Sequence, residues 1–264
     1  MTVLRDLVYA PELGPFGQLD LYLPDDAGTC PLLVFFHGGG LCAGDRGDGR
    51  NPVCLRLARS GIAVAAVSYR LYRFLPPSPG KEALLSADSP RYPDFIEDGA
   101  KAVAWLMQSG RQFHPFSSWY VGGSSAGAYL AMMLFFDTRF LDRHGIDARA
   151  LDGFFFDAGQ PTVHFNVLAE RGLDSRLVRI DPAAPLYWAD AGLARGDMPK
   201  ICIVYAQQDI VNRREQNLLL YRTMLHLGYD SGKLRIIEMK GYGHTGYNQD
   251  VDVYAPLIEN WIRA

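Results

Sequence analysis

The sequence has few cysteines and no long apolar segment. Its 264 residues include four cysteines without Cys-x-x-Cys spacing, which disfavours a disulfide framework or a metal site: Cys30, Cys42, Cys54 and Cys202. No stretch approaches the roughly 18 consecutive apolar residues of a membrane-spanning helix. Residues 1–7 carry charges where a secretory signal would need an unbroken apolar run, so we expect a cytoplasmic protein.

The chain also lacks an excess of positive charge. Its formal net charge is −3, which disfavours binding to nucleic acid or to an anionic membrane surface and favours a small-molecule partner. No internal repeat or low-complexity tract is present. The length and the 48% hydrophobic content predict one domain over residues 1–264.

Strand-like and helix-like segments alternate along the chain, which predicts an α/β fold with a mostly parallel sheet covered on both faces. We expect about eight strands, the first two antiparallel, at residues 4–9, 18–23, 32–36, 62–68, 118–121, 151–157, 201–205 and 233–239. Helices are expected near residues 51–59, 94–108, 126–136, 213–226 and 253–263. Two long connections stand out. One is a loop at residues 71–91, and the other, at residues 160–199, is predicted to form a small cap or lid.

The run Gly-Ser-Ser-Ala-Gly at residues 123–127 lies between a predicted strand and a predicted helix. A G-x-S-x-G at such a junction is typical of a nucleophile elbow, a turn so tight that glycine is needed on either side of the serine. Its register predicts Ser125, and not the adjacent Ser124, as the nucleophile. The next backbone N–H, that of Ala126, then lies at a helix N-terminus beside the serine.

Upstream, the run His-Gly-Gly-Gly at residues 37–40 follows a predicted buried strand. Three consecutive glycines leave backbone N–H groups uncovered by side chains, so that a substrate carbonyl can approach them closely. This run is typical of the second half of an oxyanion hole. We expect the ring of His37 to brace the glycine loop.

Asp209 and His244 follow the last two predicted strands, so the chain order is serine, aspartate, histidine. Serine needs a base to become nucleophilic, and the aspartate would hold the histidine tautomer. His164 is an alternative base, and Asp157 is an alternative acid. The remaining histidines lie in connections or inside a predicted helix, which makes them poorer candidates: His114, His144 and His226.

These motifs, in this order, resemble the α/β-hydrolase superfamily, and more narrowly the esterases related to hormone-sensitive lipase and to bifunctional feruloyl and acetyl-xylan esterases. The resemblance extends to Ser-Tyr-Arg-Leu at residues 68–71 and to Tyr-Pro-Asp-Phe-Ile-Glu-Asp at residues 92–98. It implies ester hydrolysis through an acyl-enzyme without a cofactor. The oxyanion donors that it implies are the N–H groups of Gly39, Gly40 and Ala126, with Gly38 as an alternative to either of the first two.

The start of strand-like sequence almost at Met1 leaves no room for the helical N-terminal cap of many such relatives. We therefore expect an open site for short-chain acyl esters, including acetyl or aryl esters of carbohydrates. Aromatic residues at 164–165 and 187–188 suit an aryl or sugar face, or pack the cap onto the core. An arylformamidase and a non-catalytic small-molecule-binding protein are the alternatives, and a homodimer is compatible with the sequence.

Overall fold

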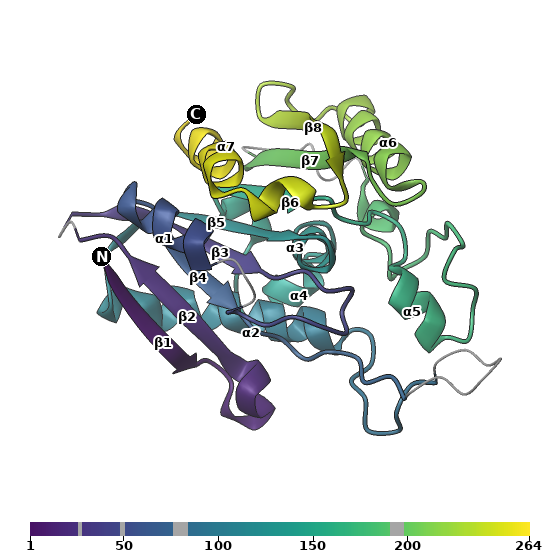
Figure 1. Cartoon of the computed structure of the whole chain (residues 1–264), viewed down its shortest axis with the longest axis horizontal. Helices are drawn as coiled ribbons and strands as arrows, with labels where there is room; N and C mark the ends of the chain where they lie inside the picture. The colour runs from purple at the N-terminus through teal and green to yellow at the C-terminus, as the bar shows by residue number, and fades with distance from the viewer. Residues whose placement is uncertain (26–27, 48–50, 76–83, 191–197) are drawn as a thin grey trace.

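The computed structural model describes residues 1–25, 28–47, 51–75, 84–190 and 198–264. Within these residues eight strands form one sheet, in the order β1-β2-β4-β3-β5-β6-β7-β8 (Figure 1). The first two strand pairs, β1 with β2 and β2 with β4, are antiparallel, and all the others are parallel. The strands are β1 (Thr2–Val8), β2 (Gln18–Leu23), β3 (Cys30–Phe36), β4 (Ala63–Val67), β5 (Phe116–Ser124), β6 (Gly153–Asp157), β7 (Lys200–Gln208) and β8 (Leu234–Gly243).

Helices cover both faces of the sheet, as the alternating pattern predicts (Figure 1). Side chains of α1 (Asn51–Arg59) and α7 (Val251–Arg263) share one apolar core with the sheet. Side chains of α2 (Asp94–Ser109), α3 (Ala126–Phe136) and α6 (Arg213–His226) belong to a second core. Every residue of α3 is buried, because this helix is apolar on all sides and lies between the sheet and its neighbours. None of the helices in the described ranges is long and apolar enough to cross a membrane.

The last two strands run further than the sequence predicts. Beyond a register irregularity after Ala206, Gln208 pairs with Gly243, so β7 and β8 end side by side. The extra residues bring both strands to the same edge of the sheet. This pairing places Asp209 and His244, the next residues along the chain, next to each other.

The two long connections are described only in part. An isolated antiparallel bridge joins Phe74 and Leu85 in the first of them, and residues 76–83 lie outside the described residues. The second contains the short helix α5 (Phe165–Glu170) and the 3₁₀ turn η4 (Pro185–Trp188), and residues 191–197 lie outside the described residues. The indole of Trp188 lies under the guanidinium of Arg139, which follows α3.

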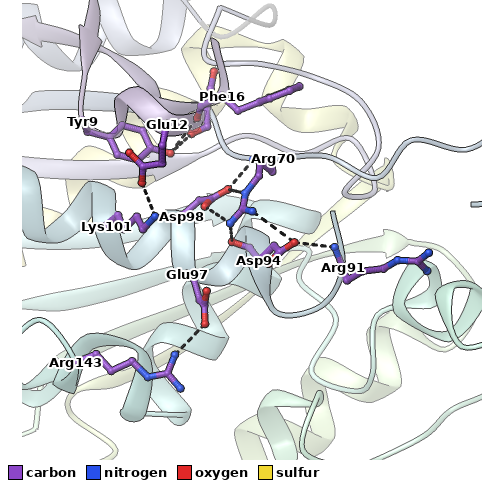
Figure 2. Close-up of polar contacts among 11 residues, drawn as sticks. Tyr9, Glu12, Phe16, Arg70, Arg91, Asp94, Glu97, Asp98, Lys101 and Arg143 are labelled. Carbon is purple, nitrogen blue, oxygen red and sulfur yellow. Dashed lines mark hydrogen bonds and ion pairs between the residues drawn. The ribbon is translucent and has the colours of Figure 1, made fainter. Parts of the chain in front are cut away.

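The Ser-Tyr-Arg-Leu motif has a structural role that Figure 2 shows. Arg70 donates two hydrogen bonds to the buried carboxylate of Asp98 on α2, at 2.8 and 2.7 Å. Arg70 also forms an ion pair with Asp94, at 3.5 Å. On the other side of the motif, the Tyr9 hydroxyl donates to the carbonyl of Ser68 at 2.7 Å. The motif therefore ties the chain after β4 to α2.

Replacing Asp98 by alanine should lower the free energy of unfolding by about 3 kcal/mol, because it leaves the half-buried Arg70 without its two-pronged acceptor. Glu97→Ala is the matched control on the same helix. Its ion pair with Arg143 is exposed, and its loss should cost less than about 1 kcal/mol. Urea unfolding of both variants measures the difference, and equal costs would contradict a structural role for the Arg70 pair.

Candidate active site

Ser125 lies between β5 and α3 with φ of 54° and ψ of −111°, a conformation that non-glycine residues rarely adopt. The backbone on either side of Ser125 lies very close to neighbouring backbone atoms. A Cβ on Gly123 would lie 2.4 Å from the backbone carbon of Gly127, and one on Gly127 would lie 2.0 Å from the Phe36 carbonyl oxygen. Glycine is therefore required at both positions of the elbow, and the turn presses against the end of β3.

Ser125, His244 and Asp209 form one chain of hydrogen bonds. The Ser125 Oγ lies 2.8 Å from His244 Nε2, and His244 Nδ1 lies 2.5 Å from Asp209 Oδ1. The Asp209 side chain is fully buried, and its carboxylate also accepts from the backbone N–H groups of Ala206 and Ile210. With Nδ1–H donating to the carboxylate, Nε2 is left to accept the serine proton. The order along the chain predicted these three partners.

The glycine loop lies beside the elbow, because β3 and β5 are parallel neighbours in which Phe36 pairs with Gly123. Gly39 and Gly40 have φ of +104° and +63°. Both carbonyls accept hydrogen bonds: that of Gly39 from the N–H groups of residues 42 and 43, and that of Gly40 from Asn166 Nδ2 at 2.5 Å. The N–H of Ala126 is in the first turn of α3, where no partner exists within the helix.

The alternative base, His164, is buried at the start of α5. Among the hydrogen bonds of the described residues, none joins His164 to Ser125. Its Nδ1 accepts from the Asn166 N–H at 3.2 Å, which caps the helix. Burial, with smaller contributions from the charges of Arg213 and His244, lowers the pKa of His164 well below its usual value. His164 is therefore neutral and positions α5, which leaves His244 as the histidine in contact with the serine.

The alternative acid, Asp157, is at the buried end of β6. Its carboxylate accepts from Tyr247, Asn248 and Tyr254. Within the described part of the chain, His244 Nδ1 donates to Asp209 instead. His37 lies in the loop, where its Nδ1 donates to the Gly38 carbonyl at 2.7 Å and its ring stacks on Tyr69 at 4.3 Å between centroids.

Two residues at the site have no signature in the sequence. Asn166 reaches the glycine loop from α5, 126 positions along the chain from Gly40. Arg213 is buried at the start of α6 and donates to the Ala158 carbonyl at 2.7 Å, and its burial lowers its pKa to about 10. Arg213 begins a helix, where a charged residue is expected to be exposed, so its burial is visible only in the structure. Among the described residues, no group of His, Cys, Asp or Glu side chains is arranged to hold a metal ion.

Comparisons with known proteins found similar sequences and similar folds. The BD-FAE family model matches residues 19–144. Esterase LipI of Mycobacterium tuberculosis is 32% identical over 133 residues, which is 49% of this chain and 37% of LipI. Tuliposide A-converting enzyme 2 of Tulipa gesneriana is 24% identical over 280 residues, 94% of this chain and 67% of that enzyme. The alignments with the first three curated relatives span 27–37% of the length of those proteins.

Solved structures show the same fold. A truncated carbohydrate esterase from gut microbiota superposes with a TM-score of 0.73 at 16% identity, covering 100% of this chain and 96% of the other. An esterase of Pyrobaculum calidifontis has a TM-score of 0.70 at 21% identity, covering 100% of this chain and 87% of the other. The sheet, the elbow and these likenesses show that the chain has the α/β-hydrolase fold. Within that class, the relatives that match its sequence include proteins named as esterases.

Proposed function

We propose that the protein is a serine carboxylesterase that hydrolyses short-chain carboxylic esters. The observation that carries this proposal is the hydrogen-bonded chain from Ser125 through His244 to Asp209, beside a loop of three glycines. A nucleophile, a base and an orienting acid within hydrogen-bond reach are the parts that acyl transfer needs. The relatives named esterase support the same reaction class.

In the proposed mechanism, Ser125 Oγ attacks the ester carbonyl carbon while His244 Nε2 takes its proton and Asp209 stabilises the resulting imidazolium. The carbonyl oxygen becomes an anion, which accepts hydrogen bonds from the N–H groups of Gly39, Gly40 and Ala126, with Gly38 as an alternative donor.

His244 then protonates the leaving alcohol, which leaves the acyl group on Ser125. Water, deprotonated by the same histidine, attacks this acyl-enzyme, and Ser125 regains its proton as the acid departs. These steps use side chains and backbone groups of the protein together with the substrate and one water molecule.

We propose acetyl and small aryl esters, including those of carbohydrates, as the substrates. The regular elements in the described part of residues 160–190 are the short helix α5 and the turn η4. Phe165 lies next to Gly40, where it would contact the acyl or alcohol group. The gut-microbiota structure with the same fold is named a carbohydrate esterase, which supports this substrate class.

A series of p-nitrophenyl esters from C2 to C12 tests the proposal. We expect kcat/KM to be highest at C2 to C4, and a maximum at C8 or longer would contradict the open site. Acetylated xylo-oligosaccharide and N-formylkynurenine are assayed in parallel. Turnover of N-formylkynurenine without turnover of esters would select the arylformamidase. A fluorophosphonate should label the peptide that contains Ser125, and a folded protein that is not labelled would favour a binding protein.

Replacing Asn166 by alanine should lower kcat about tenfold, because the Gly40 carbonyl loses the hydrogen bond that fixes the orientation of the glycine loop. The change in KM should be smaller, since the proposed oxyanion forms only during the reaction. Asn166→Asp is the second variant. It replaces the donor with an acceptor facing the carbonyl, and it should lose at least as much activity. Unchanged kcat in both variants would show that the hydrogen bond from Asn166 to the glycine loop does not contribute to catalysis.

Four further points stay predictions from the sequence. They are a single domain over residues 1–264, a cap at about 160–199, a cytoplasmic location and a homodimer.

A further inference from the structure

Asp157 is a fully buried carboxylate that the proposed reaction does not use. One of its oxygens accepts from the Tyr247 hydroxyl. The other accepts from the Tyr254 hydroxyl at 2.7 Å and from Asn248 Nδ2 at 3.4 Å. Taking a carboxylate out of water costs several kcal/mol unless donors replace the lost water. The fold therefore keeps Asp157 where three donors converge.

The donors to Asp157 come from two different elements. Tyr247 and Asn248 belong to the turn η6 (Gly246–Gln249), which follows His244 after a single residue, Thr245. Thr245 has φ of 55°, so the chain changes direction directly after His244. Tyr254, in contrast, lies on α7. Asp157 is thus connected to the turn that directly follows His244 and, separately, to the helix α7.

The same end of β6 also holds the elbow. The backbone N–H of Ser125 donates to the Asp157 carbonyl at 2.7 Å. Asn248 Nδ2 donates to the Ser124 hydroxyl at 3.0 Å, so the turn after His244 touches the elbow directly. The proposed nucleophile and the proposed base are therefore attached to one buried residue.

We propose that Asp157 is a positioning residue that sets the distance between Ser125 Oγ and His244 Nε2 by holding the elbow and the turn η6 together. This role rests on the proposed function. Asp209 binds only Nδ1 of the imidazole. This contact orients the ring, but the turn η6 must be held by other contacts. An error of about 1 Å between reacting groups can cost about 100-fold in rate, so the anchoring of the turn matters for catalysis.

Tyr247→Phe and Tyr254→Phe form a matched pair. Both tyrosines are fully buried, and each variant removes one hydroxyl donor to Asp157, so urea unfolding should show similar losses of stability. With p-nitrophenyl acetate, Tyr247→Phe should lower kcat about tenfold with little change in KM. Tyr254→Phe should lower kcat less than twofold. Equal kcat in the two folded variants would overturn the positioning role.

A second readout does not depend on turnover. The downfield proton NMR resonance of His244 Nδ1–H, assigned by its loss in His244→Ala, should exchange faster with water in Tyr247→Phe than in the wild type. In Tyr254→Phe its exchange should match the wild type. Unchanged exchange in Tyr247→Phe would overturn the inference. If the wild type hydrolyses none of the esters, the proposed function fails, and the exchange rates still decide whether Asp157 positions His244.

Discussion

Replacing Ser125 by alanine is expected to lower kcat for p-nitrophenyl acetate by about 10⁵-fold or more, because it removes the hydroxyl that is bonded to His244 and that attacks the ester in the proposed mechanism. Ser124→Ala is the matched control. The Ser124 hydroxyl is buried and accepts from Asn248, so its loss should change kcat by less than about tenfold. Retention of more than about 1% of activity in folded Ser125→Ala would contradict the serine mechanism.

The double variant Ser125→Ala/His244→Ala extends the test. The serine and the histidine act as a unit, since the base has no function without the proton that it removes. The double variant should therefore be no slower than Ser125→Ala alone. If the fold-loss of kcat in the double variant equals the product of the fold-losses in the two single variants, the residues act independently. That result would contradict a mechanism in which His244 takes the proton of Ser125.

Gly127→Ala is expected to prevent folding or to lower the free energy of unfolding by more than about 4 kcal/mol. A Cβ on Gly127 would lie 2.0 Å from the carbonyl oxygen of Phe36 and 2.6 Å from that of His37. Both are backbone atoms at the end of β3, which cannot turn aside as a flexible side chain can. Relief would require α3 to move away from the sheet, and that movement would open the fully buried interface of α3.

Gly145→Ala separates this close approach from ordinary glycine effects. Gly145 has φ of +72°, and a Cβ there would lie more than 4 Å from every described residue other than its two chain neighbours. Only backbone strain opposes the substitution, at a cost of about 1 kcal/mol. Soluble yield, circular dichroism and urea unfolding compare the two variants. A Gly127→Ala protein as stable as Gly145→Ala would show that the elbow does not press against β3.

Local patterns were enough to predict the fold. The antiparallel opening pair, the parallel strands and the five longer helices were predicted from periodicity and glycine placement, and the structure confirms them. Strand ends were less accurate. β7 and β8 extend to Gln208 and Gly243, because their pairing continues past an irregularity that no local pattern indicates.

The sequence by itself determined an α/β fold with a mostly parallel sheet and predicted the elbow at Ser125, because strand period, helix period and glycine spacing are properties of short segments. It predicted His244 as the base and Asp209 as the acid, with His164 and Asp157 as alternatives. Only the tertiary structure decided which of these side chains meet Ser125. The physical reason is that hydrogen bonding and burial depend on atoms brought together from distant strands, and no local pattern records which distant atoms those are.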